Sequence, residues 1–489
     1  MRPPWSGAAQ QQALECVDNT APAVPAASCF ACPTLRLPFS VSLSRPPTLL
    51  TLFFLFQDVA KSMGSSAIVE SLFPCLETLV TNGDVDTVRV KAVTACGPMI
   101  LNMDQRACTG TILPLMEALV TDRSWTIRHA AVNHFAALAG VVGPDTTRSV
   151  LTNAIQTMLD DPEGEVRKSC IQQVNAVLDA MGPGGAGTKE GCALIDSLTR
   201  LAEDEYAAVR LAVMDCAMKL LRSGNESVHE LVMTFAESEE DETKLPVLAD
   251  LAEIARNLPK SEVGTKLMPI IESILVGWKV GGREPQSQTI GGSDSGSNVS
   301  CVVIYPQDAG SSWRQRQKVI ANMVGIGRHT GADSFTASLL PLLLVTLADP
   351  INAVRREVVL ALASATKEFG MRWAIENLVG PLVDMMDDAS AATVTTVPLL
   401  SAYAAVLDAE EPGASATEAA LAFLPCVIKI ASGTMNPTVA IASIPALGAL
   451  ARNLSAGDVS SRVMPLLEAL CKDEEVDVSR RANAVVATM

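Results

Sequence analysis

Residues 121–135 read Thr-Asp-Arg-Ser-Trp-Thr-Ile-Arg-His-Ala-Ala-Val-Asn-His-Phe, an acidic turn followed by an Ile-Arg pair and an apolar run. The same arrangement, with Val-Arg or Ile-Arg at its centre, recurs along the chain. The arginines of the recurring pair are Arg89, Arg128, Arg167, Arg210 and Arg355. The first three are 39 residues apart, and the fourth follows after 43. A nearly fixed period indicates one structural unit that is repeated many times.

A period of about 40 residues with two helices per unit is typical of the HEAT/armadillo class. We therefore predict an all-α fold, a HEAT-repeat α-solenoid in which antiparallel helix pairs form a right-handed superhelix of about ten repeats. In each unit, helix A leads into a turn that contains an Asp, and helix B opens on the arginine-bearing pair. Because a solenoid presents a long surface rather than a catalytic pocket, we expect the function to be binding.

Each predicted helix shows the apolar spacing of an amphipathic helix. Helix A often opens on an apolar residue followed by Pro, as in Leu113-Pro114, because Pro is tolerated in a first helical turn. The Asp ahead of helix B is placed to cap its free N–H groups. In the unit around residues 121–135, helix B is expected to stop near Gly140. Its predicted apolar stripe is Ile127, Ala131, Phe135 and Leu138.

Two stretches differ from the repeats. Residues 1–60 are rich in Pro and show no helical period, which predicts a disordered leader. Residues 280–311 are rich in Gly and Ser, which predicts a flexible insertion. The repeats are thereby divided into an N-terminal part (61–279) and a C-terminal part (312–489). The apolar run at 48–56 is too short to span a bilayer, so we predict no membrane segment.

The composition limits the classes of partner. The formal net charge of −17 argues against nucleic acid, since phosphate binding needs a surplus of Lys and Arg. The chain has twelve cysteines, most of them single and on apolar helix faces. Buried, reduced thiols of this kind are typical of cytoplasmic or nuclear proteins, with disulfides or a zinc site as the less favoured alternatives.

The sequence offers no basis for catalysis. Its four histidines cannot supply an obvious metal cluster, because His129 and His134 are five residues apart and miss the spacing of a zinc-binding helix. The sequence contains no nucleophile elbow, Walker A motif or dinucleotide-binding fingerprint. We therefore predict a protein that is not an enzyme, with no catalytic residues, no metal site and no cofactor.

The repeated arginine has two interpretations. It could form a row that binds anions, or a surface ladder in which each arginine lies near the Asp of the adjacent unit and fixes the register of the stack. We favour the ladder, because stacking of equal units brings equivalent turns side by side.

Several units resemble the scaffold (A, 65-kDa regulatory) subunit of serine/threonine protein phosphatase 2A. Residues 121–145 are similar to that family's "D-K-S-W-R-V-R…F…V-G-P" repeat, and residues 312–316 to a later "K-W-R-V-R" repeat. Residues 367–374 resemble its "K-x-F-G-x-x-W-A" stretch, and residues 463–478 its C-terminal "V-x-P-I-L-E-x-L…D-x-D-V-D-V". The four patterns occur in the same order, and the resemblance covers about residues 65–489 without the insertion.

The resemblance implies a horseshoe whose intra-repeat turns form a binding ridge. C-terminal repeats would hold the phosphatase catalytic subunit, with Trp313 and Arg314 at that interface. N-terminal repeats would hold a regulatory B subunit, with Trp125 and Arg128 at that interface. An indole in an exposed turn is a good interface anchor, although each Trp could instead pack its own turn against the next repeat.

The sequence therefore predicts a non-catalytic scaffold of a protein phosphatase 2A-type holoenzyme, in the cytoplasm and nucleus, with protein partners and neither nucleic acid nor membrane. The alternative is a HEAT-repeat adaptor or transport receptor that binds basic protein cargo through its acidic surface. Three features depart from the family's pattern. The chain has about ten repeats where the family has about fifteen, and the insertion lies immediately before Trp313. The pattern also fades in the unit around residues 381–395 and in the one at Ala440, where the expected arginine is absent.

Overall fold

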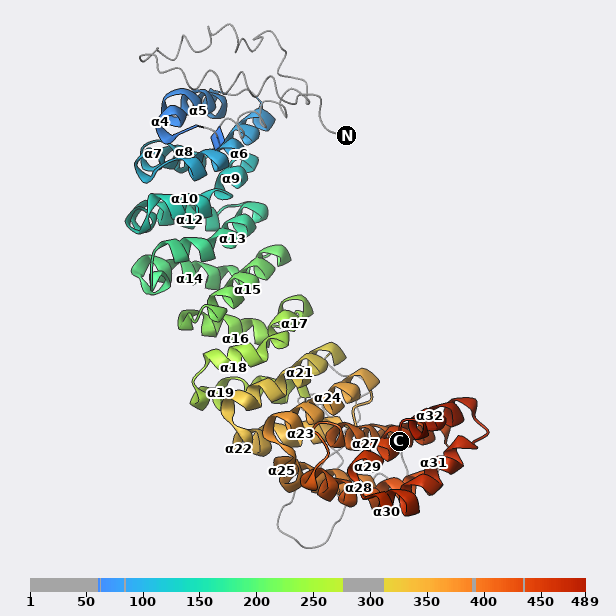
Figure 1. Cartoon of the computed structure of the whole chain (residues 1–489). Helices are drawn as coiled ribbons and strands as arrows, with labels where there is room; N and C mark the ends of the chain where they lie inside the picture. The colour runs from blue at the N-terminus through green and yellow to red at the C-terminus, as the bar shows by residue number, and fades with distance from the viewer. Residues whose placement is uncertain (1–59, 62, 83–84, 276–311, 389–392, 434–435) are drawn as a thin grey trace, which may run out of the picture. The chain divides into compact units, whose positions relative to one another are not determined.

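The computed structural model describes residues 60–61, 63–82, 85–275, 312–388, 393–433 and 436–489 (Figure 1). Within these ranges every regular element is a helix, which confirms the predicted all-α fold. The predicted leader, apart from Ala60, and the predicted insertion lie outside the described residues. Their disorder and flexibility therefore stay predictions.

The described residues are divided into two compact units, the first ending at Cys216 and the second beginning at Ala217, both within the range of helix α15. In the first unit η1 and η2 are single π turns and η3 is a 3₁₀ turn. The elements of the first unit are α4 (Ser65–Ala67), η1 (Ile68–Leu72), α5 (Phe73–Asn82), α6 (Asp86–Asn102), α7 (Gln105–Gly110), α8 (Ile112–Leu119), α9 (Trp125–Val132), α10 (Phe135–Val142), α11 (Pro144–Thr146), η2 (Thr147–Leu151), α12 (Thr152–Leu159), α13 (Gly164–Ala180), η3 (Gly185–Gly187), α14 (Lys189–Leu201) and α15 (Ala207–Arg222).

The second unit continues the same alternation of short and long helices. The π turns here are η5, η6 and η7, and η4 is a 3₁₀ turn. Its elements are η4 (Glu226–Val228), α16 (His229–Glu237), α17 (Asp241–Ala249), α18 (Leu251–Asn257), α19 (Lys260–Lys266), α20 (Met268–Leu275), α21 (Trp313–Thr330), α22 (Ala332–Ser334), η5 (Phe335–Leu339), α23 (Leu340–Thr346), α24 (Asn352–Phe369), α25 (Met371–Ala374), η6 (Ile375–Val379), α26 (Gly380–Asp388), α27 (Thr393–Leu407), α28 (Ala414–Gly433), α29 (Pro437–Asn453), α30 (Ala456–Asp458), η7 (Val459–Val463), α31 (Met464–Cys471) and α32 (Val476–Val486).

Within each unit the helices are stacked as pairs in two layers (Figure 1). The layer of B helices is continuous: in the first unit α6 packs on α9, and α9 and α10 pack on α13. In the second unit α21 packs on α17 and α18, and α24, α27, α29 and α32 follow in order. The A helices form the other layer, for example α12 on α14 and α26 on α28. Both units are thus α-solenoids of the HEAT type, as the period of the sequence predicts.

Helix B of the unit around residues 121–135 is split into α9 and α10. The predicted apolar stripe is fully buried, so the face was assigned correctly. The chain, however, makes a short turn at Asn133 and His134, which the sequence does not announce because it has neither Gly nor Pro there. The helix also continues past Gly140 to Val142 and ends at Gly143, whose φ of +82° suits Gly.

Helix A starts earlier than the apolar-Pro pair in several units, so the prediction that this pair opens the helix was wrong there. Before Pro341 the chain makes the π turn η5, in which Leu340 N–H donates to Phe335 O, five residues back. The same bond precedes Pro74 and Pro465. A π turn moves the preceding carbonyl away from the proline ring, which lets the proline lie inside a longer helix.

Helix α28 is the most apolar long helix of the described residues, and by length and composition alone it could cross a membrane. In the structure it packs against α26, α27, α29 and α31. Its Phe423 ring stacks on Tyr403 with a centroid distance of 4.1 Å. We interpret α28 as a core helix of the stack.

No disulfide joins two cysteines within the described part of the chain. Cys96, Cys170, Cys216 and Cys426 are buried and Cys471 is half-buried, as predicted from their place on apolar faces. Burial raises the pKa of the Cys96 thiol to about 12, so this side chain behaves as a small apolar core residue.

Candidate partner-binding ridge

Buried ion pairs join neighbouring repeats at the start of their B helices. In the first unit Arg128 Nε lies 2.6 Å from Asp161 Oδ2, and its Nη2 lies 2.8 Å from Oδ1. Arg167 binds Asp204 in the same two-pronged way, with both contacts at 2.8 Å. Each arginine therefore binds the turn Asp of the next unit. We call this series of pairs the arginine ladder.

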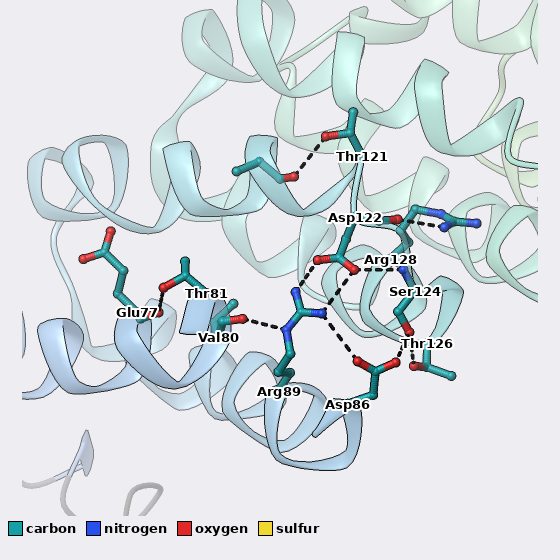
Figure 2. A network of polar contacts seen from close by, with 11 residues as sticks. Glu77, Val80, Thr81, Asp86, Arg89, Thr121, Asp122, Ser124, Thr126 and Arg128 are labelled. Atoms are coloured by element: carbon teal, nitrogen blue, oxygen red, sulfur yellow. Dashed lines mark hydrogen bonds and ion pairs between the residues drawn. The ribbon is translucent and has the colours of Figure 1, made fainter. Parts of the chain in front are cut away.

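The first pair of the ladder is drawn in Figure 2. The guanidinium of Arg89 lies between Asp122 of the next turn and Asp86 of its own helix. Its Nε donates to Val80 O at 2.8 Å. Asp86 also accepts a hydrogen bond of 2.6 Å from Ser124 Oγ, so this carboxylate links two successive turns as well (Figure 2).

Each ladder arginine also holds its own turn. The Nη1 of Arg128 donates to the carbonyl of Asp122 at 2.8 Å, and the Nη1 of Arg167 donates to the carbonyl of Asp161 at 2.7 Å. Arg210 and Arg355 make the equivalent bond at 2.6 Å. The arginine thus fixes the shape of the intra-repeat turn as well as its distance from the next one.

The turn aspartates do not cap helix B in the predicted way. Asp122 Oδ1 accepts the N–H of Ser124, which is itself the N-cap residue of α9, at 2.9 Å. The same bond, to the N–H two residues ahead, recurs at Asp161, Asp204, Asp349 and Asp473. The carboxylate therefore shapes the turn before the helix, because its remaining acceptor sites are directed to the neighbouring arginine.

The ladder is buried, so the prediction of a surface ladder was correct in its pairing and wrong in its location. The Arg167 and Asp204 side chains are 9% and 6% exposed. At Asp122 burial alone would raise the carboxyl pKa, but the hydrogen bonds from Arg89 and Ser124 outweigh it and lower the pKa. A guanidinium held in this way is occupied within the fold, which disfavours the interpretation as an anion-binding row.

The second unit repeats the ladder only in part, because several of its repeats have no arginine at the ladder position, for example Ala440 in α29 and Ser479 in α32. Arg316 binds Asp349 at 2.8 Å and 3.2 Å, and both side chains are almost completely buried. Ala440 occupies the ladder position that precedes Asp473. Helix α29 still packs on α32 through its apolar face, so the stack is continuous here without an ion pair.

A row of exposed apolar side chains lies on the intra-repeat turns, most of which the ladder holds. Five of the ten large apolar side chains exposed in the described part of the chain lie three or four residues before a ladder position. Such positions are only two of about forty in each repeat, so this enrichment is not a property of the surface in general. We call these residues, together with Trp313, the turn ridge. The five are Val85, Trp125, Tyr206, Ile351 and Val476.

In the first unit the ridge residues rest on a fixed support. Trp125 is 43% exposed and makes an edge contact with the His129 ring. The Tyr206 ring lies over the guanidinium of Arg167, 5.5 Å from its carbon. Gly164 leaves room for that ring, because a Cβ at this position would lie 3.0 Å from Tyr206 Cδ2. Both aromatic side chains are therefore exposed while they rest on a supporting neighbour.

Acidic side chains surround the ridge of the first unit. The exposed residues of the two turns between Trp125 and Tyr206 are mostly carboxylates. They are Glu163, Glu165, Glu203 and Glu205. A partner segment that combines apolar and basic side chains would match this surface.

In the second unit Trp313 is the first residue of α21 and is half-buried. The exposed Arg314 guanidinium stacks over its ring at 4.8 Å from the centroid. Gln315 anchors the start of this helix, since its Nε2 donates to Asp241 Oδ1 on α17 at 2.5 Å. Trp313 and Arg314 thus form one amphipathic anchor with a guanidinium edge and an aromatic edge.

The four residues predicted as interface residues differ in their surroundings. Trp125 and Arg314 are exposed and Trp313 is half-exposed, whereas Arg128 is a ladder residue whose side chain is only 12% exposed. A role of Arg128 at an interface would therefore be indirect, through the shape of the turn. The interface roles of all four stay predictions. Sequence reasoning missed Val85, Tyr206, Ile351 and Val476, although their fixed offset from the ladder position could have identified them.

The described residues contain no group of three or more His, Cys, Asp or Glu side chains that could hold a metal ion. The ridge is instead a set of apolar anchors on rigid turns. Fold and ridge together define a HEAT-type α-solenoid with a continuous surface feature in each unit.

Comparison with known proteins supports this class at the level of the fold. No protein-family model matches the sequence, and no curated protein matches it significantly. Among solved structures, the karyopherin Kap121p bound to RanGTP is 13% identical over 91% of this chain and 49% of its own, with a TM-score of 0.56. Kap121p bound to the extreme C-terminus of the protein phosphatase Cdc14p is 14% identical over 92% and 47%, with a TM-score of 0.53.

A third structure, Kap121p bound to Nup53p, is 15% identical over 92% of this chain and 46% of its own, with a TM-score of 0.52. The chain thus spans about half of the length of these karyopherins. At such identities the similarity concerns the helical-repeat fold.

Proposed function

We propose that this chain is a non-catalytic helical-repeat scaffold whose intra-repeat turns bind other proteins. The recurrence of exposed apolar side chains at equivalent positions of the turns carries this proposal. Ion pairs of the ladder hold most of these turns in place, so little conformational entropy is lost when a partner docks on them. Aromatic and arginine side chains on such a support are typical interface anchors.

More specifically, we propose a scaffold of a protein phosphatase 2A-type holoenzyme. The catalytic subunit would dock at Trp313 and Arg314, and a regulatory B subunit at the ridge of the first unit, with Trp125 as an anchor. Support comes from the four sequence patterns shared with that family and from the accessibility of both tryptophans. The function would be positional: two partners held on one chain meet at a high effective concentration.

A pull-down with the phosphatase 2A catalytic subunit tests this assignment. The Trp313→Ala/Arg314→Ala variant should recover much less catalytic subunit than the wild type. Trp125→Ala is the matched control, because it removes an exposed indole from the other unit and should leave recovery unchanged. Circular dichroism of each variant would show that the helices are retained. Equal recovery by the double variant would remove the assigned site.

The second candidate is an adaptor or transport receptor for basic protein cargo. The similar solved structures favour it, since they are karyopherins captured with protein partners and with RanGTP. The carboxylates around the first unit's ridge would suit a basic cargo segment. Their attraction would weaken with added salt.

Two measurements separate the candidates. Binding of RanGTP, together with salt-sensitive binding of a basic peptide, would favour the transport receptor. Recovery of the phosphatase catalytic subunit that depends on Trp313 would favour the scaffold.

A further inference from the structure

Two aromatic anchors of the turn ridge in the first unit are separated by a turn that has none. The start of α9 carries Trp125 and the turn ahead of α15 carries Tyr206, which are 43% and 51% exposed. In the turn between them, the positions three and four residues before Arg167 hold Gly164 and Glu163 instead. A partner that lies along this part of the ridge therefore meets an aromatic ring, a carboxylate and a second aromatic ring, in that order.

The arginine ladder holds these three turns in register. Arg128 joins the first turn to the middle turn through Asp161, and Arg167 joins the middle turn to the third through Asp204. The Tyr206 ring rests on the guanidinium of Arg167, so its position is tied to the middle turn as well. The spacing of the two rings and of the carboxylate between them is therefore a fixed property of the fold, which a partner has to match.

Exposed charges give this part of the ridge a direction. The middle and third turns each carry two exposed glutamates, whereas the turn at Trp125 carries the exposed Arg123. One of the four glutamates, Glu165, pairs with Lys168 of its own helix at 3.2 Å. The other three form no ion pair within the described part of the chain; they are Glu163, Glu203 and Glu205. A segment with basic side chains at its centre and at the Tyr206 end, and none beside Trp125, matches this distribution.

The stacking distance of the repeats sets the length of the matching segment. Helices packed side by side lie about 8–10 Å apart, so anchors two repeats apart are separated by about 16–20 Å. An extended chain advances about 3.3 Å per residue, so about five or six residues span this distance. Side chains of an extended chain alternate between two faces, and a separation of about six residues places both apolar side chains on the ridge. The side chains two and four residues after the first one then face the middle turn.

We propose that this part of the ridge binds an extended segment of a partner protein in which two apolar side chains, about six residues apart, flank two basic side chains. The first apolar side chain packs on Trp125 and the second on Tyr206. The basic side chains between them bind Glu163 and Glu205. The inference rests on the proposed function, since it names the chemistry of a segment that the intra-repeat turns of the first unit bind.

Other occupants fit this surface less well. A nucleic acid would bring its phosphates against the glutamates, which repel them. An acidic protein segment would be repelled in the same way. A purely apolar segment would cover the two rings but would give the carboxylates beside them no counter-charge, so it should bind more weakly than a basic one.

The test measures the fluorescence anisotropy of labelled peptides in the presence of the full-length chain. The probe is the capped heptapeptide Leu-Ser-Lys-Ser-Lys-Ser-Leu, with the dye on an N-terminal linker. One control replaces both lysines by glutamate. The other has the same composition but adjacent apolar residues, Leu-Leu-Ser-Lys-Ser-Lys-Ser. The probe should bind in a saturable way and about tenfold more tightly than either control.

Three variants assign the contacts. Trp125→Ala/Tyr206→Ala removes both rings and should weaken binding of the probe about tenfold or more. Glu163→Gln/Glu205→Gln should weaken it about fivefold and make it less sensitive to salt. Glu117→Gln removes an exposed charge from the A helix α8, in the other layer, and should leave binding unchanged. All replaced side chains are exposed, so circular dichroism should show the same helix content in each variant.

Four outcomes overturn the proposal. Equal binding of the glutamate peptide would show apolar docking alone, and equal binding of the isomer would show that the spacing is not recognised. A dimer in sedimentation that Trp125→Ala abolishes would assign the ridge to a second copy of the chain. Absence of binding by any peptide would show that the first unit's ridge takes no extended segment.

These outcomes are distinguishable from failure of the proposed phosphatase scaffold, because its catalytic-subunit site lies in the other unit. If the probe binds as expected but the Trp313→Ala/Arg314→Ala variant recovers as much catalytic subunit as the wild type, the phosphatase assignment fails and the inferred segment stands. If the probe fails and that variant loses the catalytic subunit, only the inferred segment fails.

Discussion

Arg167 illustrates how much of this structure depends on single side chains. Its guanidinium donates to two carbonyls of its own turn, binds the carboxylate of Asp204 in the next turn, and supports the ring of Tyr206. The pairing follows from the sequence, because the arginines and the turn aspartates recur with the same period, so that stacking brings each arginine to the aspartate of the next turn. The burial does not, since it depends on which neighbouring side chains cover the guanidinium.

Replacing Arg167 by Met should therefore be costly. The substitution leaves the Asp204 carboxylate, which is 6% exposed, without its cation. Breaking a buried pair from one side typically costs about 3–5 kcal/mol. Urea unfolding followed by circular dichroism should show a loss of this order in the part of the transition that involves the first unit.

Arg200→Met provides the matched control on the neighbouring helix. Arg200 pairs with Asp160 at 3.1 Å, but both side chains are more than half exposed. An exposed pair contributes at most about 1 kcal/mol, so this variant should unfold almost like the wild type. If the two variants lost equal stability, burial would not be what gives the ladder its strength.

At the scale of elements, helix α21 depends on a glycine that is not at a turn. A Cβ at Gly327 would lie 2.4 Å from Phe335 Cδ2. The Phe335 ring is held by Phe369 and Trp373, with centroid distances of 5.0 Å and 5.8 Å, so it has little room to move. Gly327→Ala should therefore destabilise the second unit by about 1–3 kcal/mol, despite the higher helix propensity of Ala.

Gly264→Ala is the corresponding control in α19. A Cβ there would meet nothing within 4 Å, so only the propensity gain should remain, at most about 1 kcal/mol of added stability. Thermal unfolding of the two variants should shift in opposite directions. A shift of both toward higher temperature would show that the Phe335 cluster repacks freely.

Because His134 is buried at the split of helix B, we expect the stability of the first unit to depend on pH. Burial lowers the pKa of this histidine, and its Nε2 has no hydrogen-bond partner among the described residues. The pKa of His134 in the folded chain lies below the unfolded value of about 6.5. The buried neutral imidazole therefore makes its full contribution to the free energy of unfolding above that pH. This contribution decreases as the pH falls from about 6.5 through the folded pKa, by about 1.4 kcal/mol for each unit of the pKa shift.

Comparison of the wild type with His134→Leu isolates this contribution from other titrating groups. Between about pH 7.5 and 5.5 the wild type should lose more stability in urea unfolding than the variant. Parallel losses in the two proteins would mean that His134 is not a titrating group of the first unit in this range.

The buried face of a helix could be predicted from the sequence where the apolar period alone determines it. The stripe of α9 and α10 follows from that period, whereas the turn at Asn133 and His134 depends on contacts with the preceding helix. The ring of His134 lies beside Gly97 of α6, where a Cβ would be 3.2 Å from its Cε1. Such a fit between two repeats cannot be read from either sequence stretch alone. The π turns before Pro74, Pro341 and Pro465 were missed because local propensity favours Pro in a first turn.

At the scale of the whole molecule, the repeat period was enough to predict the fold class. The position of the candidate site on the intra-repeat turns came from the resemblance to the phosphatase scaffold and stays a prediction. The tryptophans were singled out because they match the repeat patterns of the phosphatase scaffold family. Val85, Tyr206, Ile351 and Val476 were not, because single aliphatic or aromatic residues carry no motif. The role of the ridge becomes apparent only when equivalent positions of all repeats are compared in the structure.

A solenoid should transmit a local defect only to its neighbours, because each repeat contacts only the adjacent ones. Hydrogen exchange followed by mass spectrometry tests this in the intact chain. Arg167→Met should speed the exchange of amides in α13 and its neighbours α12 and α14, and leave α24, α27 and α29 at wild-type rates.

Gly327→Ala should give the reverse pattern, with faster exchange around α21 and η5 and no change in α9 and α13. The two variants serve as controls for each other, since each perturbs one compact unit and leaves the other as an internal reference. A uniform increase along the whole chain in either variant would show that the units unfold as one cooperative body. In that case the ladder would stabilise the entire stack, and the two docking regions proposed for the phosphatase subunits would be coupled through it.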